Sequence, residues 1–199
     1  FYTFNNYEAW IGSMWPLAIG GFIIALVTIF KKSWAPITAP LYAIVEGLFL
    51  GVISMFFENM FNGIVFQAIY LTFGIFFTLL LLYKSKIIKP TENFKLGVAA
   101  ATGGIFILYM VSLFMSMFGG GVMPIMDITN SSMISIGFSV FVVIIASLNL
   151  VLDFDFIEEA AERGVPKYME WRATLGLLVT LVWLYLEILR LLAKLQSRR

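Results

Sequence analysis

Six long apolar runs, separated by short polar stretches, dominate the hydrophobic pattern of the chain. A helix that crosses a membrane needs about 20 mostly apolar residues, and each run is near that length. Proline and glycine clusters punctuate the chain between the runs, because both residues disfavour the continuation of a helix. The pattern predicts six membrane-spanning helices, at residues 14–30, 37–57, 62–83, 96–118, 133–152 or beyond, and 173–193.

The segment before the first run has a different character. Residues 1–10 carry aromatic side chains beside Asn5, Asn6 and Glu8, a composition typical of a membrane interface. The first residue is Phe1 rather than methionine, so we expect the chain to begin inside a longer gene product. Residues 1–10 are then the stump of a truncated first helix, in a single helical domain that extends over residues 1–199.

Composition supports a membrane location. Hydrophobic residues make up 61% of the 199 positions and charged residues only 13%, and the mean hydropathy is +0.95. A water-soluble domain of this size cannot hide so much apolar surface, whereas a bilayer solvates it. We therefore predict an all-α integral membrane protein. The net charge of +1 argues against a nucleic-acid partner, which would require clustered basic patches.

The chain contains neither cysteine nor histidine. Disulfides, thiol catalysis and cysteine-based metal sites are therefore excluded, and the usual proton shuttle is missing. The phosphate-binding pattern G-x-x-x-x-G-K-[ST] is also absent. We expect no enzymatic activity and no resident cofactor, with Ca²⁺ and protons as ions that the chain could bind or pass.

Lysine and arginine predict the orientation. Nine of them lie in the loops at residues 31–36, 84–95 and 163–172, and none lies in the two loops between these. Short loops rich in lysine and arginine face the cytoplasm. If the last run crosses fully, the basic tail of Lys194, Arg198 and Arg199 lies on the opposite side. Either the last run is re-entrant or tilted, or the tail is an exception to the rule.

Glycines occur within several runs, where small surfaces let helix backbones approach closely. The pairs Gly20-Gly21 and Gly103-Gly104 are of this kind, and we interpret them as packing residues. Gly47 and Gly51 follow Glu46 on the same helix. Because glycine has no side chain, the helix surface around Glu46 is narrow and a neighbouring helix can approach it.

Four acidic residues lie within or at the end of apolar runs, namely Glu46, Asp153, Asp155 and Glu187. An ionised carboxylate at membrane depth costs at least about 2.5 kcal/mol, so each one needs compensation. For Glu46 the alternatives are an ion site and a protonated carboxyl that is hydrogen-bonded inside the bundle.

Helical spacing gives Glu187 one specific alternative. Arg190 lies three residues after it and Lys194 seven, all on one face, so an intrahelical ion pair is as plausible as a functional role.

For Asp153 and Asp155 the alternative is a cap where the fifth helix leaves the membrane. This interpretation weakens if the helix continues through residues 156–162, which would leave Asp153 about 15 Å inside the helix end.

Carboxylates that lie close together in a low-dielectric interior cannot all be ionised. Such a group would bind either protons or Ca²⁺, which prefers hard oxygen ligands, and each would displace the other. Without histidine, a response to pH near neutrality must come from carboxyl groups. We interpret Asp153 and Glu187 as a candidate transient Ca²⁺ site.

Four motifs, in order, carry a resemblance to a known family. They are Pro36-Ile37-Thr38-Ala39-Pro40-Leu41-Tyr42-Ala43 followed by residues 46–51, then residues 148–158, 166–171 and 183–190. Together they are similar to the bacterial branch of the Bax inhibitor-1 family, and the similarity extends over nearly the whole chain. The resemblance implies a bundle of seven helices with the last at its centre, of which the first is missing here.

Characterised members of this family are pH-sensitive Ca²⁺ leak channels with a sensor made of two acids. By motif these acids fall on Asp153 and Glu187, and a basic latch falls on Lys31 or Lys32, with Arg190 as a further candidate. Here the second acid is glutamate instead of aspartate. A lysine replaces the usual arginine of the latch and loses its two-pronged pairing with a carboxylate.

The leading hypothesis is a passive, pH-modulated Ca²⁺ leak in a bacterial cytoplasmic membrane, in which Asp153 and Glu187 attract cations when deprotonated and separated. Two alternatives remain open. One is a proton-coupled secondary transporter that uses the same acids. The other is a non-transporting regulator that binds another membrane protein, such as a protease.

Overall fold

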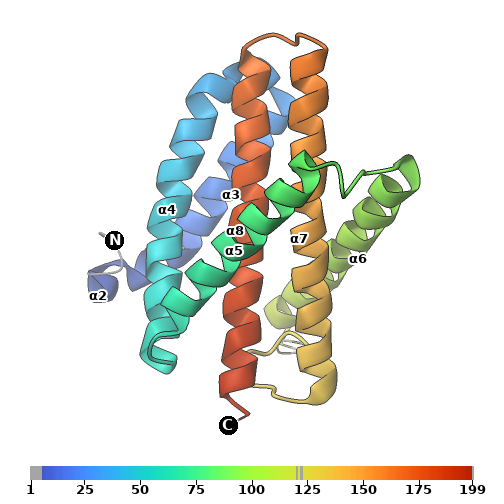
Figure 1. The fold of residues 1–199 in the computed structure, drawn as a ribbon. Helices are drawn as coiled ribbons and strands as arrows, with labels where there is room; N and C mark the ends of the chain where they lie inside the picture. Colours follow the sequence, from blue (N-terminus) through green and yellow to red (C-terminus); the bar gives the residue numbers. More distant parts are fainter. Residues whose placement is uncertain (1–5, 120, 122, 199) are drawn as a thin grey trace. The chain divides into compact units, whose positions relative to one another are not determined.

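A computed structural model describes residues 6–119, 121 and 123–198. Six long helices make up most of the described chain, which contains no strand (Figure 1). All six are long and apolar enough to cross a bilayer, and this confirms the predicted all-α membrane fold. They are α3 (Met14–Phe30), α4 (Ala35–Met60), α5 (Ile64–Lys84), α6 (Glu92–Met117), α7 (Met133–Glu162) and α8 (Tyr168–Gln196).

Two short elements precede α3, namely α2 (Tyr7–Trp10) and η1 (Ile11–Ser13), and a third, η2 (Lys32–Trp34), lies between α3 and α4. The first five residues of the segment that we interpreted as the tail of an earlier helix lie outside the described residues, and so does Arg199. The single domain predicted for residues 1–199 stays a prediction.

Four of the six helices, namely α4, α6, α7 and α8, extend at least two residues beyond the predicted runs at a polar end, whereas α5 begins two residues later than predicted. Hydropathy marks only the part of a helix that lies in hydrocarbon, whereas backbone hydrogen bonds continue through the interface. The largest extension is in α7, which continues to Glu162 as a helix of 30 residues. Asp153 therefore lies well inside α7, and this weakens its interpretation as a cap at the end of the helix.

The prolines near the start of α4 do not separate it from α3 as expected. Pro36 occupies the first turn, where the missing N–H has no partner to lose, and Pro40 lies inside the helix. The boundary is formed instead by Lys31 and η2, so only four residues connect the two helices.

A threonine side chain caps the start of α6. Thr91 is the N-cap residue, and its hydroxyl oxygen accepts a hydrogen bond from the Phe94 N–H at 3.3 Å. One of the free N–H groups in the first turn is thereby satisfied.

Replacing Thr91 by alanine should lower the free energy of unfolding by about 0.5–1 kcal/mol, because the Phe94 N–H loses its acceptor. Thermal unfolding of the purified protein in detergent measures the change. Thr174→Ala, at an exposed position inside α8, gives the reference for an exposed threonine outside a helix cap. Equal stability of Thr91→Ala and the native chain would show that water caps this exposed helix end equally well.

The chain divides into two compact units. Unit 1 comprises residues 1–65 and 153–182, and unit 2 comprises residues 66–152 and 183–199. Helices α7 and α8 contribute residues to both. Asp153 belongs to unit 1 and Glu187 to unit 2, so each is described with the neighbours of its own unit.

In unit 1, α3 packs against α4 along small and polar residues. Ala39 and Tyr42 of α4 form a buried cluster with Leu175 of α8. The hydroxyl of Thr28 on α3 donates to the Thr38 hydroxyl on α4 at 2.7 Å, and both side chains are buried. At the other end of this unit, the Glu58 carboxylate accepts from the N–H groups of Gly63 and Val65, which closes the turn into α5.

In unit 2, a second cluster joins three helices. Ile105 of α6 packs with Val142 and Ile145 of α7, and Tyr109 and Trp183 pack against this cluster. The amide of Asn149 on α7 donates to the Thr102 hydroxyl on α6 at 2.8 Å. These contacts place polar groups of α6, α7 and α8 in one interior.

The last predicted run is a continuous helix, α8, of 29 residues. A re-entrant segment reverses direction within the membrane, and α8 has no such reversal, so this alternative is wrong for the described residues. In unit 2 the C-terminal part of α8 contacts the loop between α6 and α7, through a hydrogen bond from Lys194 to the Ile125 carbonyl.

Candidate functional site

Asp153 lies nine residues before the end of α7, which corresponds to roughly 14 Å of helix. The Thr180 hydroxyl on α8 is within hydrogen-bonding reach of the Asp153 carboxylate and of the Gly176 carbonyl, at 3.2 Å for the latter. One hydroxyl hydrogen serves only one acceptor at a time. Gly176 leaves room beside the acid, because a Cβ there would lie 3.6 Å from Asp153 Oδ1.

The second oxygen of this carboxylate has no partner. Asp153 Oδ2 is buried and, within the described chain, accepts no hydrogen bond. An ionised oxygen in that position is unfavourable until a proton or a cation reaches it. Asp155, half-buried, points elsewhere, since residues two apart lie about 200° apart around a helix.

Glu187 is in a different situation, because its charge is compensated. Its side chain is 2% exposed and forms an ion pair with Arg190, three residues on. Arg190 Nη1 lies 2.8 Å from Oε1 and 2.9 Å from Oε2. The intrahelical ion pair that we considered for Glu187 is therefore present.

Tyr109 of α6 completes this group. Its hydroxyl donates to Glu187 Oε1 at 2.5 Å and accepts from Arg190 Nη1 at 2.7 Å. The guanidinium also lies 5.3 Å from the centre of the Tyr109 ring. We call Tyr109, Glu187 and Arg190 the polar triad. Every member contacts the other two, which is a low-energy arrangement for a buried charge pair.

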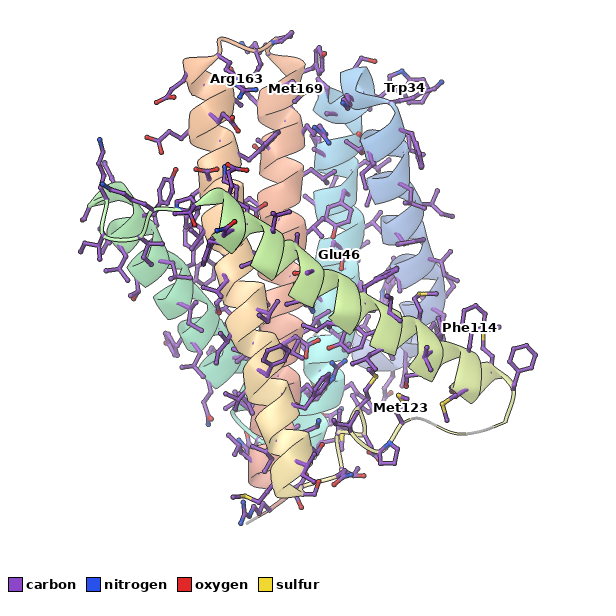
Figure 2. The ribbon with its side chains drawn as sticks, turned by 90° about the vertical axis from the view of Figure 1, so that its right-hand side faces the viewer. Trp34, Glu46, Phe114, Met123, Arg163 and Met169 are labelled. Atoms are coloured by element: carbon purple, nitrogen blue, oxygen red, sulfur yellow. The ribbon has the colours of Figure 1, made fainter. Side chains whose placement is uncertain are left out.

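Glu46, in the middle of α4 (Figure 2), is buried against α3. A Cβ built at Gly21 would lie 2.6 Å from Glu46 Oε2, which is shorter than real contacts allow. A larger residue at position 21 would therefore force the Glu46 carboxyl, the far end of a flexible side chain, to shift. The protonated carboxyl and the ion site both stay predictions for Glu46.

The three basic latch candidates differ in their surroundings. Lys31 and Lys32 are exposed, and the Lys31 ammonium lies 4.4 Å from the centre of the Trp34 ring. Arg190 is the candidate that contacts a predicted sensor acid within its own unit, through Glu187. The latch role of all three stays a prediction.

The glycines differ in their surroundings. A Cβ built at Gly47, Gly103 or Gly104 meets no described atom of its own unit within 4 Å, and a packing role for these glycines stays a prediction. Gly51 is buried in α4. A close approach lies at Gly21, the second residue of the Gly20-Gly21 pair.

Sequence reasoning missed Tyr109 and Thr180. Both contact their acid from another helix, and their spacing from it in the sequence carries no signal. The one available sign is that Tyr109 lies in the middle of a span, whereas tyrosine in membrane helices is enriched at the interfaces.

A cation held by Asp153 and Glu187 together stays a prediction. Among the described residues there is no group of three or more acids that would hold a metal ion.

Comparison with known proteins gives one finding. The family described as "Bax inhibitor 1 like" matches residues 1–197, nearly the full length of the chain. No curated protein and no solved structure matches.

Proposed function

Because the chain belongs to the Bax inhibitor-1 family, we propose that this multi-pass membrane protein is a passive cation leak that admits Ca²⁺ and closes when Asp153 binds a proton. We assign it to the cytoplasmic membrane of a bacterium, with the loops rich in lysine facing the cytoplasm.

One observation carries the proposal, namely the unpartnered Oδ2 of Asp153, buried far from the end of α7. A carboxylate oxygen is the ligand that Ca²⁺ prefers, and the same oxygen binds a proton. Deprotonated Asp153 attracts a cation into the interior, and protonated Asp153 does not. The competition between the two makes the flux depend on pH.

The charged groups near Asp153 on α7 and α8 of unit 1 do not offset the negative charge of its carboxylate. Asp155 and Glu158 follow on α7 and carry the same charge. On α8 the guanidinium of Arg172 lies over the Phe156 ring at 5.8 Å. From α8, the group that reaches the Asp153 carboxylate is the neutral hydroxyl of Thr180.

Glu187 is the second acid of the proposal. Its oxygens are engaged by Tyr109 and Arg190, so it takes part in cation binding only after these bonds exchange. The polar triad is therefore the arrangement of Glu187 when no cation is bound to it.

The test is uptake of ⁴⁵Ca²⁺ by liposomes that contain the full chain, over a pH series. We expect flux to fall as the pH is lowered. In Asp153→Asn it should be roughly tenfold lower at alkaline pH, since a buried carboxylate attracts a divalent cation by more than about 1.4 kcal/mol. The remaining flux of this variant should not change with pH.

Asp155→Asn is the matched control, because it removes an acid two residues away on another face of α7. It should keep the native pH profile. An Asp153→Asn variant with an unchanged profile would refute the proposal. Flux driven by an imposed proton gradient would indicate a proton-coupled secondary transporter, and inert liposomes would favour a regulator that binds another membrane protein.

A further inference from the structure

The loop between α6 and α7 contains a folded segment, residues 123–132, that begins at Met123 (Figure 2). Asp127 accepts hydrogen bonds from the N–H of Thr129 at 2.9 Å and from its hydroxyl at 2.7 Å. These bonds hold the pKa of Asp127 below its usual range. The Asn130 amide donates to the Pro124 carbonyl at 2.7 Å. The segment therefore has a defined shape of its own.

A buried lysine of α8 holds this segment. Lys194 is fully buried, and its ammonium donates to the Ile125 carbonyl at 2.7 Å, the Ser139 hydroxyl at 2.9 Å and the Ser135 carbonyl at 3.3 Å. An ammonium has three hydrogens, so all of them are used. The first acceptor belongs to the segment and the other two to α7. None of the three acceptors carries a charge.

Asp127 and Glu187 attract Lys194 without direct contact among the described residues. A buried ammonium that forms no ion pair is expensive, and it is stable only while hydrogen bonds replace its water. The Ile125 carbonyl supplies one of those bonds. If the segment moves away, Lys194 loses this acceptor and must take up water. Burial of the charge is thus coupled to closure of the segment.

The remaining attachments of the segment in unit 2 are weaker. The Ser135 hydroxyl donates to the same Ile125 carbonyl at 3.2 Å, and the Met123 N–H donates to the Ser112 hydroxyl at 3.3 Å. Both join neutral groups at long distance, whereas a hydrogen bond from a charged donor is stronger. The bond from Lys194 is therefore the main attachment of the segment to α8.

We propose that residues 123–132 form a lid over the end of unit 2 where α6, α7 and α8 meet, and that Lys194 is the latch of this lid. Opening admits water to Ser135 and Ser139, which are each 1% exposed when the lid is closed. By the distribution of basic loops, this end faces away from the cytoplasm. The lid does not depend on which ion, if any, the chain passes.

The chain has no cysteine, which allows a direct test by labelling. A single Ser135→Cys substitution places a thiol beneath the lid, and reaction with a water-soluble maleimide in nanodiscs reports its opening. We expect the labelling rate to rise about tenfold when Lys194→Met is added, because the charged donor is lost. Arg198→Gln removes an exposed charge four residues further along the chain, beyond the end of α8, and should leave the rate unchanged.

A second thiol separates opening from unfolding. Ser54 is buried in α4 of unit 1, and a thiol in Ser54→Cys should stay unlabelled when Lys194→Met is present. Ser139→Ala removes one neutral acceptor with little risk to folding and should raise the labelling of Ser135→Cys by a smaller factor. Equal rates with and without the Lys194 and Ser139 changes, or labelling at both thiols, would overturn the proposal.

Discussion

Replacing Arg190 by methionine is expected to lower the free energy of unfolding by about 3 kcal/mol or more, since it leaves the Glu187 carboxylate buried without its cation. The loss is large because Glu187 is almost fully buried and Arg190 Nη1 contacts both of its oxygens. The Tyr109 hydroxyl alone then remains as a donor to the acid. Thermal and chemical unfolding in detergent measure the effect.

The double variant Glu187→Gln with Arg190→Met is the decisive comparison. It removes both charges together, and we expect it to recover most of the lost stability, because a neutral amide still bonds to Tyr109. The exposed pair of Glu159 and Arg163 supplies a matched reference, and Arg163→Gln should cost at most about 0.5 kcal/mol. If Arg190→Met costs no more than Arg163→Gln, the ion pair of Glu187 with Arg190 does not stabilise the fold and the prediction is wrong.

Gly21→Ala is expected to destabilise the protein by about 1 kcal/mol, the low end of the usual cost of overpacking an interior, because the atom in the way ends a flexible side chain. The added Cβ would lie 2.6 Å from Glu46 Oε2 and 3.9 Å from the Tyr42 ring. Either the Glu46 carboxyl must leave its position or α3 must move away from α4. The same unfolding measurement in detergent reports the change.

The neighbouring glycine gives the control for this prediction. A Cβ at Gly20 would lie 3.7 Å from Val45 Cγ1, an ordinary contact, so Gly20→Ala should be close to neutral. Shortening the acid in a Gly21→Ala and Glu46→Ala double variant should restore part of the loss, since the colliding oxygen is removed. An equal loss in Gly20→Ala and Gly21→Ala would indicate a general effect of alanine on this helix pair.

Much of the fold could be predicted from the sequence, because a bilayer imposes one strong requirement on every span. Residues 14–30 illustrate this, since their apolar run coincides with α3. The ends of α7 and α8 were less predictable, because their outer turns are polar and helix propensity there competes with turn formation. The pairing of Glu187 with Arg190 followed from helical spacing alone.

Contacts between helices were beyond such reasoning. Tyr109 and Glu187 are 78 residues apart in the sequence, and a hydroxyl in an apolar run is compatible with many partners. The acceptors of Lys194 were equally hidden, since two of them are backbone carbonyls, which every residue has. The sequence reasoning placed Lys194 on the face of Glu187, yet its hydrogen bonds go to α7 and the lid.

The link between α3 and α4 has a consequence for how the protein reaches the bilayer. Only Lys31 and η2 separate the two helices. A link this short does not let one helix insert into the bilayer independently of the other. We expect them to enter during synthesis as one hairpin. In that hairpin the carboxyl group of Glu46 on α4 already lies against Gly21 of α3. The carboxyl group is therefore not exposed to lipid during insertion.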